Sequence, residues 1–217
     1  MIKFLLTILL SLSLSCGHTS TPVREVKSPI QTQHASTHRI HIVSSLNTID
    51  ELGAGAHCSS TAVGQHVLLT AMHCVANSNL IYLDKDTEPT IILAELPDGN
   101  DHVLYIVKRD FQNFVPLVQR KLKPQEPVHF WGNPGKSRDV YRDGFYAKLR
   151  YVDSFNYTFQ LFTLPVYRGD SGAGIMDAEG NVVAVVSLAN ESAEELSLPL
   201  AFSQKQLVAA GVTYVVQ

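Results

Sequence analysis

Short runs in which hydrophobic and polar residues alternate follow one another along the chain from residue 39 onward. Alternation with a period of two is typical of β-strands that bury one face. Turn-forming segments such as Pro-Asp-Gly-Asn at residues 97–100 separate the runs. The pattern of the first half therefore predicts a small antiparallel β-barrel of about six strands. Its strands are expected at residues 40–43, 53–63, 67–70, 81–83, 90–93 and 102–107.

A second set of strands follows residues 116–127, which are rich in proline and charge and are expected to link two halves of the chain. These halves would cover residues 39–115 and 128–217. Only residues 203–210, closed by Gly211, have the pattern of a helix, and that helix is short. The strands of the second half are expected at residues 128–131, 144–151, 157–164, 174–176 and 182–188.

The N-terminal segment has the features of a signal peptide. Lys3 supplies a positive charge, and residues 4–14 form an apolar stretch that is too short to span a bilayer. We therefore expect residues 1–16 to direct export. Residues 17–38 contain seven Ser or Thr residues and no Leu, Phe, Tyr or Trp. They are expected to form a flexible tether, with a disordered pro-segment as the alternative.

Composition excludes several classes of protein. With 217 residues, 45% of them hydrophobic, the chain can bury a complete core. The net charge of -3 and the scattered basic residues argue against a nucleic-acid partner. Outside the N-terminus, no apolar stretch approaches the roughly 18 residues that a membrane-spanning helix needs, so the mature chain is not expected to cross a membrane.

Two short motifs carry the candidate chemistry. Ser171 lies between Asp170 and Gly172, in a turn whose small residues allow backbone N–H groups to converge beside a nucleophilic hydroxyl. An ordinary surface turn would have the same composition. His73 lies just past the end of a predicted strand that contains the apolar run 67–69. An imidazole there could serve as the base that a serine nucleophile needs.

Residues 70–74, Thr-Ala-Met-His-Cys, and residues 169–172, Gly-Asp-Ser-Gly, resemble two motifs of the chymotrypsin-like (trypsin-like) serine endopeptidases. The family motifs read T-A-A-H-C and G-D-S-G-G-P. This resemblance implies two six-stranded antiparallel β-barrels with the active site in the crevice between them. It also implies a catalytic aspartate between the histidine and the serine in chain order.

Asp101 is similar to that family aspartate because an alternating apolar strand, residues 102–107, follows it directly. Other aspartates near His73 in the chain lack such a strand. They are Asp84, Asp86 and Asp110.

The resemblance assigns a role to each of these residues. His73 would act as the general base, Asp101 would orient the imidazole, and Ser171 would attack the peptide carbonyl. The backbone N–H groups of Gly169 and Ser171 would form the oxyanion hole. No cofactor is implied, the substrate would be a protein or peptide, and a monomer is expected. The alternatives are an inactive binding or adhesion module with the same fold, and an esterase that uses the same triad.

The resemblance also locates a pocket for the residue that precedes the scissile bond. No acidic residue is expected at its floor, so cleavage after Lys or Arg is disfavoured, and an apolar or small side chain is expected instead. Arg168 would lie beside the oxyanion turn, where it could attract an acidic group or face solvent. The floor would come from Pro165 and Val166, and the walls from Ser187, Leu188 and Ala189.

Three cysteines leave one without a partner. The resemblance implies a disulfide between Cys58 and Cys74 that clamps the histidine loop, and such a bond requires an oxidising compartment. Zinc is disfavoured, although His57-Cys58 and His73-Cys74 repeat one dipeptide, because adjacent strand residues point to opposite faces.

Cys16 is the remaining cysteine, and it stands at the end of the predicted signal segment. Residues 12–17 resemble the lipobox of bacterial lipoproteins, which implies a lipid anchor on Cys16 and a place in the periplasm or at the cell surface. Ordinary signal cleavage near Ser15, followed by secretion, is the alternative.

Activation is expected to differ from that of many family members. They insert a newly freed Ile-Val-Gly-Gly terminus beside the aspartate that precedes the serine, and this chain has no such motif. We therefore expect Asp170 to have another partner in a constitutively folded protein.

Overall fold

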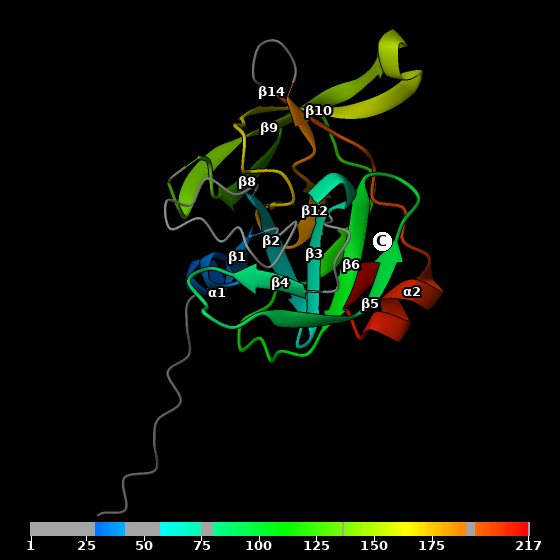
Figure 1. Cartoon of the computed structure of the whole chain (residues 1–217). Coiled ribbons are helices and arrows are strands. Elements are labelled where there is room, and N and C mark those ends of the chain that lie inside the picture. The colour runs from blue at the N-terminus through cyan, green and yellow to red at the C-terminus, as the bar shows by residue number, and fades with distance from the viewer. Residues whose placement is uncertain (1–28, 42–56, 75–79, 136, 190–193, 217) are drawn as a thin grey trace, which may run out of the picture.

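The computed structural model describes residues 29–41, 57–74, 80–135, 137–189 and 194–216. Strands dominate these residues and form a closed barrel and a second sheet (Figure 1). The prediction of an all-β fold is therefore confirmed. No helix in these ranges is long and apolar enough to cross a membrane.

The first half forms the predicted six-stranded antiparallel barrel, in the order β1-β2-β3-β6-β5-β4. Its interior is filled by side chains from alternate strand positions, such as Ile40, Leu68 and Tyr105, and all three are almost completely buried. Burial of this apolar face explains why the alternation in the sequence located these strands. They are β1 (Thr37–His41), β2 (His57–Gly64), β3 (Val67–Ala71), β4 (Leu80–Leu83), β5 (Thr90–Pro97) and β6 (His102–Val107).

The pairing of β3 with β6 places the predicted histidine and aspartate side by side. Ala71, the last residue of β3, lies opposite His102, the first residue of β6. Asp101 and the short 3-10 helix η1 (Met72–Cys74) lie just beyond these two ends. The Met72 N–H donates a hydrogen bond to the Asp101 carbonyl at 2.8 Å, so the backbones are in contact at this point.

The second half forms one nine-stranded sheet in the order β13-β14-β10-β9-β8-β11-β12-β7-β15, where the alternation predicted five strands and the resemblance implied six. β7 pairs in parallel with β12 and β15, and the other pairs are antiparallel. The added strands are two to four residues long, too short for alternation to indicate them. The strands are β7 (Leu117–Gln119), β8 (Glu126–Gly132), β9 (Val140–Val152), β10 (Tyr157–Pro165), β11 (Gly174–Met176), β12 (Val182–Val185), β13 (Leu188–Ala189), β14 (Glu194–Ser197) and β15 (Tyr214–Val216).

The predicted linker, residues 116–127, is wrong in one respect because it contains the strand β7. Leu117 and Val118 are almost fully buried there. Pro116 and Pro124 lie outside this apolar pair and do not interrupt its hydrogen bonds. The pair therefore joins the second sheet, and only the residues after it connect β7 to β8.

The predicted tether, residues 17–38, is wrong for its last ten residues. They form the helix α1 (Pro29–Ala35) and the start of β1. Tertiary contacts order this polar segment: His129 Nε2 lies 2.9 Å from Gln33 Oε1, and the Ser36 carbonyl accepts the Ala62 N–H at 2.7 Å. The predicted signal segment, the remainder of the tether and Cys16 lie outside the described residues and stay predictions.

The predicted C-terminal helix is confirmed as α2 (Gln204–Ala210). The Ser203 side chain accepts the Gln206 N–H, and the Gln206 side chain bonds back to the Ser203 N–H. This capping box satisfies backbone donors that the first helical turn leaves free.

Candidate active site

The His73 ring and the Asp101 carboxylate form a hydrogen-bonded pair at the end of the first barrel. His73 Nδ1 lies 2.8 Å from Asp101 Oδ2. The His73 backbone N–H donates to Asp101 Oδ1 at 3.0 Å, so both carboxylate oxygens hold the same residue. The side chain of Asp101 is 21% exposed and that of His73 is 43% exposed, which places the carboxylate behind a ring that solvent and substrate can reach.

The three rejected aspartates each have a different partner. Asp101 alone of the four compared aspartates contacts His73, as its sequence position predicted. Asp84 pairs with His38, Asp86 with Arg109, and Asp110 with His66.

The pKa of Asp101 reflects two opposing effects. Burial would raise the pKa of this carboxyl, but the hydrogen bonds and charge of His73 outweigh burial, and the pKa lies below its usual value. Asp101 is therefore an anion at neutral pH. An anion in this position favours the tautomer of His73 that carries its proton on Nδ1 and leaves Nε2 free to accept another.

The backbone of Ser171 lies against the segment that carries His73. Its carbonyl accepts the Ser59 N–H at 2.7 Å and lies 3.7 Å from Cys74 Sγ. Gly172 allows this approach, because a Cβ at that position would lie 2.2 Å from Thr70 Oγ1. Among the described residues, no hydrogen bond joins the Ser171 hydroxyl to the His73 ring. Such bonds commonly tighten only when substrate is bound.

The turn before Ser171 leaves two backbone donors without a partner. The Asp170 N–H donates to the Tyr167 carbonyl at 2.9 Å, and Gly169 has a φ of 102°, which favours glycine. The Arg168 carbonyl accepts the Gly135 N–H at 2.9 Å, so the Gly169 N–H of the same peptide points the opposite way. In the described part of the chain, neither the Gly169 N–H nor the Ser171 N–H has a hydrogen-bond partner.

Asp170 has the alternative partner that the sequence called for. Arg142 Nη1 lies 2.7 Å from Asp170 Oδ2, and the Tyr167 N–H donates to the same oxygen at 2.9 Å. The guanidinium also lies over the rings of Phe130 and Tyr167. Burial nevertheless raises the pKa of Asp170. Its other oxygen, Oδ1, is buried and has no hydrogen-bond partner among the described residues.

The disulfide predicted between Cys58 and Cys74 is present. It joins β2 to η1 and so fixes the residue that follows His73. We expect a Cys58→Ser/Cys74→Ser variant to lose about 3 kcal/mol of unfolding free energy, since the bridge closes a loop of 16 residues. Urea unfolding would measure the loss, with Cys16→Ser as the control that keeps the bridge. An unchanged unfolding midpoint would show that the bridge adds no stability.

Strand β14 lies between the parts of the chain that were predicted to form the primary pocket. β10, which ends at Pro165, pairs with one side of β14, and β13 (Leu188–Ala189) pairs with the other. Val166 and Ser187 are buried, whereas Arg168 is exposed beside the oxyanion turn. The structure therefore gathers these segments around β14, a strand that the sequence did not indicate.

A buried acid on β14 was missed by the sequence analysis. The side chain of Glu195 has no exposed surface, and its Oε1 accepts the Ser187 N–H at 2.7 Å. Burial raises the pKa of Glu195 well above its usual value, and the negative charges of Asp170 and Asp101 add to the shift. The local signal, two glutamates before Leu196, is typical of a surface segment.

An apolar hollow of about 290 Å³ opens beside the histidine and was also missed. The hairpin of β9 and β10 supplies its aromatic wall and extends away from the rest of the second sheet (Figure 1). The Tyr157 hydroxyl donates to Asn100 Oδ1 at 2.8 Å, which ties this hairpin to the loop before Asp101. The hollow is lined by His73, Asp101, Phe155, Tyr157, Phe159, Ser187, Leu188 and Leu198.

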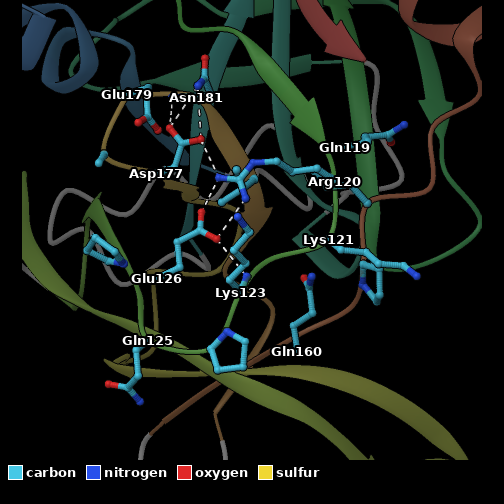
Figure 2. A pocket seen from close by; sticks show the side chains of 16 residues that line it. Gln119, Arg120, Lys121, Lys123, Gln125, Glu126, Gln160, Asp177, Glu179 and Asn181 are labelled. Carbon is cyan, nitrogen blue, oxygen red and sulfur yellow. Dashed lines mark hydrogen bonds and ion pairs between the residues drawn. The ribbon is translucent and has the colours of Figure 1, made fainter. Parts of the chain in front are cut away.

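A larger polar hollow of about 1280 Å³ contains none of the predicted site residues (Figure 2). Figure 2 shows that its central charges pair with one another. Arg120 contacts Glu126 and lies 3.1 Å from Asp177, which also accepts from Asn181. The charges of Arg120, Glu126 and Asp177 therefore balance one another within this hollow.

The closed barrel, the adjoining sheet and the His–Asp pair beside a glycine-bounded serine define a serine protease of the chymotrypsin fold. Residues 55–185 match the family model described as a trypsin-like peptidase domain, and the chain belongs to that family. Among curated proteins, none matches the sequence significantly.

Solved structures of bacterial proteases share the fold. The active form of the Rv3671c protease from M. tuberculosis has a TM-score of 0.64 and 19% identity, over 95% of this chain and 96% of that chain. The inactive form of that protease has a TM-score of 0.65 and 17% identity, over 85% of this chain and 93% of that chain. The serine endoprotease from Yersinia pestis has a TM-score of 0.62 and 15% identity, over 86% of this chain and 68% of that chain.

Proposed function

We propose that the protein is a serine endopeptidase that cleaves peptide bonds through His73, Asp101 and Ser171. One observation carries the assignment: the hydrogen-bonded His73–Asp101 pair lies next to a serine turn with two backbone donors that have no partner among the described residues. Membership of the trypsin-like peptidase family supports the same reaction class. No step of the reaction calls for a metal or cofactor.

The first step forms an acyl-enzyme. Ser171 Oγ attacks the peptide carbonyl carbon while His73 Nε2 takes the hydroxyl proton. The His73 proton then passes to the leaving amine as the C–N bond breaks. Water repeats the sequence, gives its proton to His73 and releases the acid, which restores the Ser171 hydroxyl.

Two backbone N–H groups would stabilise the oxyanion of each tetrahedral intermediate. Those of Gly169 and Ser171 have no partner among the described residues, and the hydrogen bond from the Gly135 N–H to the Arg168 carbonyl holds the peptide between Arg168 and Gly169 in place. A preorganised donor of this kind contributes about 3 to 4 kcal/mol to transition-state stabilisation.

Labelling with a fluorophosphonate tests the proposal. The purified protein should react covalently at Ser171, and the Ser171→Ala variant should not react, because only an activated serine displaces the leaving group. A folded wild-type protein that fails to label would favour the binding module instead. Comparison of peptide and simple ester turnover separates a peptidase from an esterase.

We also propose that the protein acts outside the cytoplasm, tethered by a lipid on Cys16. The basis is the signal-like segment and lipobox-like residues 12–17, together with a disulfide that needs an oxidising compartment. Metabolic labelling with a fatty-acid analogue, lost in Cys16→Ser, would test the anchor. Release of unlabelled protein into the medium would favour simple secretion.

A further inference from the structure

The side chain of Ser59, on β2 of the first barrel, contacts the turn of the second half that carries the proposed oxyanion donors. Ser59 is completely buried, and its hydroxyl donates to the Gly169 carbonyl at 2.9 Å. Its backbone N–H donates to the Ser171 carbonyl at 2.7 Å. One residue of the first barrel therefore bonds both ends of the turn from Gly169 to Ser171.

The peptide that the Ser59 hydroxyl holds is the link between the two proposed oxyanion donors. These donors are the N–H groups of Gly169 and Ser171, and the peptide that joins Gly169 to Asp170 lies between them in the chain. A peptide group is planar and moves as a unit, so a hydrogen bond to its carbonyl restrains the backbone on both sides. The Ser59 bond therefore restrains the orientation of each donor relative to the other.

Asn133, the residue that follows β8, determines where the Ser59 proton points. A hydroxyl has one donor position and two acceptor positions. The backbone N–H and the side-chain Nδ2 of Asn133 both lie 3.1 Å from Ser59 Oγ, where they fill the acceptor positions. The Asp139 N–H lies 3.4 Å from Asn133 Oδ1, which leaves the amide nitrogen on the Ser59 side. The Ser59 proton is therefore directed to the Gly169 carbonyl.

The turn is closely packed against these partners. A Cβ on Gly169 would lie 2.5 Å from the Asn133 carbonyl oxygen, and a Cβ on Gly172 would lie 2.1 Å from the Ser59 carbonyl oxygen. Thr70 Oγ1 donates to that Ser59 oxygen at 2.8 Å and so fixes Ser59 itself. Among the described residues, Ser59 is the donor to the buried Gly169 carbonyl. Loss of the hydroxyl would leave this carbonyl unpaired, and rotation of its peptide would relieve that cost.

We propose that Ser59 is a positioning residue whose hydroxyl preorganises the oxyanion hole by holding the peptide between its two donors. Ser59 does not touch the substrate. Donors that are in place before the reaction stabilise the transition state more than the bound peptide, so their displacement lowers kcat and leaves binding almost unchanged. Because Ser59 belongs to the first barrel, the oxyanion hole of the second half depends on the packing of the two halves. This role rests on the proposed peptidase function.

Steady-state hydrolysis of a fluorogenic peptide tests the role. Ser59→Ala should lower kcat by about 10- to 100-fold, less than the loss of an oxyanion donor itself, because both N–H groups remain. KM should change by less than about threefold. Ser60→Ala is the matched control, since Ser60 is also completely buried on β2 but its hydroxyl points to the opposite face, 3.4 Å from the His38 carbonyl. This control should keep the wild-type kcat.

A transition-state analogue separates positioning from a general loss of structure. A peptidyl trifluoromethyl ketone with the sequence of the fluorogenic peptide forms a tetrahedral adduct with Ser171, and its oxyanion occupies the hole. The inhibition constant of this ketone should rise in Ser59→Ala by the factor by which kcat/KM falls. The peptide acid released by cleavage should bind the variant and the wild type equally well.

Asn133→Asp is a second variant that tests the direction of the Ser59 proton. The new carboxylate has nearly the volume of the amide, but an oxygen in place of Nδ2 would accept the Ser59 proton and draw it away from the Gly169 carbonyl. We expect this variant to lower kcat in the same way as Ser59→Ala. The melting temperature of each variant confirms that it is folded.

Amide hydrogen exchange provides a measurement that does not require turnover. The Asp170 N–H belongs to the same peptide as the Gly169 carbonyl, and it donates to the Tyr167 carbonyl. Its exchange should be faster in Ser59→Ala than in the wild type, because the peptide has lost one of its two restraints. Ser60→Ala should exchange at the wild-type rate at this position.

The outcomes separate the two proposals. A protein that labels with fluorophosphonate, but whose kcat stays within about threefold of the wild type in Ser59→Ala, keeps the peptidase function and overturns the role of Ser59. Equal weakening of the ketone and the peptide acid would overturn it as well. A wild-type protein that fails to label loses the peptidase function and, with it, the role of Ser59 in the reaction. Faster exchange of the Asp170 N–H would then still show that Ser59 holds the turn, and unchanged exchange would reject this.

Discussion

Replacement of His73 by alanine should lower kcat for peptide hydrolysis by about six orders of magnitude, the effect seen when the base of a comparable serine triad is removed. The serine hydroxyl would lose the group that accepts its proton, while peptide binding, which uses other residues, should change little. Steady-state kinetics at a saturating peptide concentration would measure the fall in kcat. A loss of less than tenfold would mean that another group acts as the base.

Asp101→Asn probes the other half of the same pair and should lower kcat by about four orders of magnitude. The amide oxygen can still accept the His73 backbone N–H, so the loop should keep its position. The amide NH₂ would instead face Nδ1, forcing the ring proton onto Nε2, where it blocks proton transfer from serine.

Asp110→Asn is the matched control for this change. Asp110 forms a similar but exposed pair with His66 on the same barrel, 3.2 Å apart. This variant should keep the wild-type kcat. Equal losses in the two variants would show that the effect does not arise at His73.

The part of the site that could be predicted consists of residues whose sequence neighbours indicate the strand or turn in which they lie. His73 follows a fully buried strand, and Ser171 stands among glycines at positions where a Cβ would collide with the backbone. Asp101 could be selected because strand β6 begins at the next residue. In each case the neighbouring residues that create the sequence pattern also hold the side chain at its place in the fold.

The missed part depends on pairing between distant segments. Glu195 is buried only because β14 lies between β10 and β13, and a strand of four residues gives no periodic signal. The ordering of residues 29–38 likewise depends on contacts with β2 and β8. Sequence alone shows these segments as polar, and only tertiary partners show where polar atoms are satisfied.

Arg142 was missed for a related reason, since β9 has mostly exposed or half-buried positions and its charges resemble solvent-facing ones. The side chains of Arg142 and Asp170 are 9% and 0% exposed. Arg142 is the partner, other than a freed N-terminus, that the sequence analysis expected Asp170 to have. Its ion pair therefore connects the stability of the second sheet to the turn that carries Gly169 and Ser171.

Arg142→Ala should lower the free energy of unfolding by about 3 to 5 kcal/mol at pH 7, because it leaves the Asp170 carboxylate buried without a counter-ion. Hydrolysis should fall as well, since Asp170 bonds the Tyr167 N–H and so supports the oxyanion turn. Urea unfolding and kcat would measure the two effects. Arg150→Ala, an exposed arginine on the same strand, should change neither.

The loss in Arg142→Ala should shrink in acid. Burial already raises the pKa of Asp170, and removal of the guanidinium would raise it further. A carboxyl whose pKa is higher in the folded than in the unfolded state stabilises the fold below the unfolded value, about 3.9, and loses that contribution as pH rises through the folded value. Unfolding free energies of variant and wild type should therefore converge near pH 4. A difference that stays constant from pH 4 to pH 7 would show that lost packing on Phe130 and Tyr167, and not charge, is the main role of Arg142.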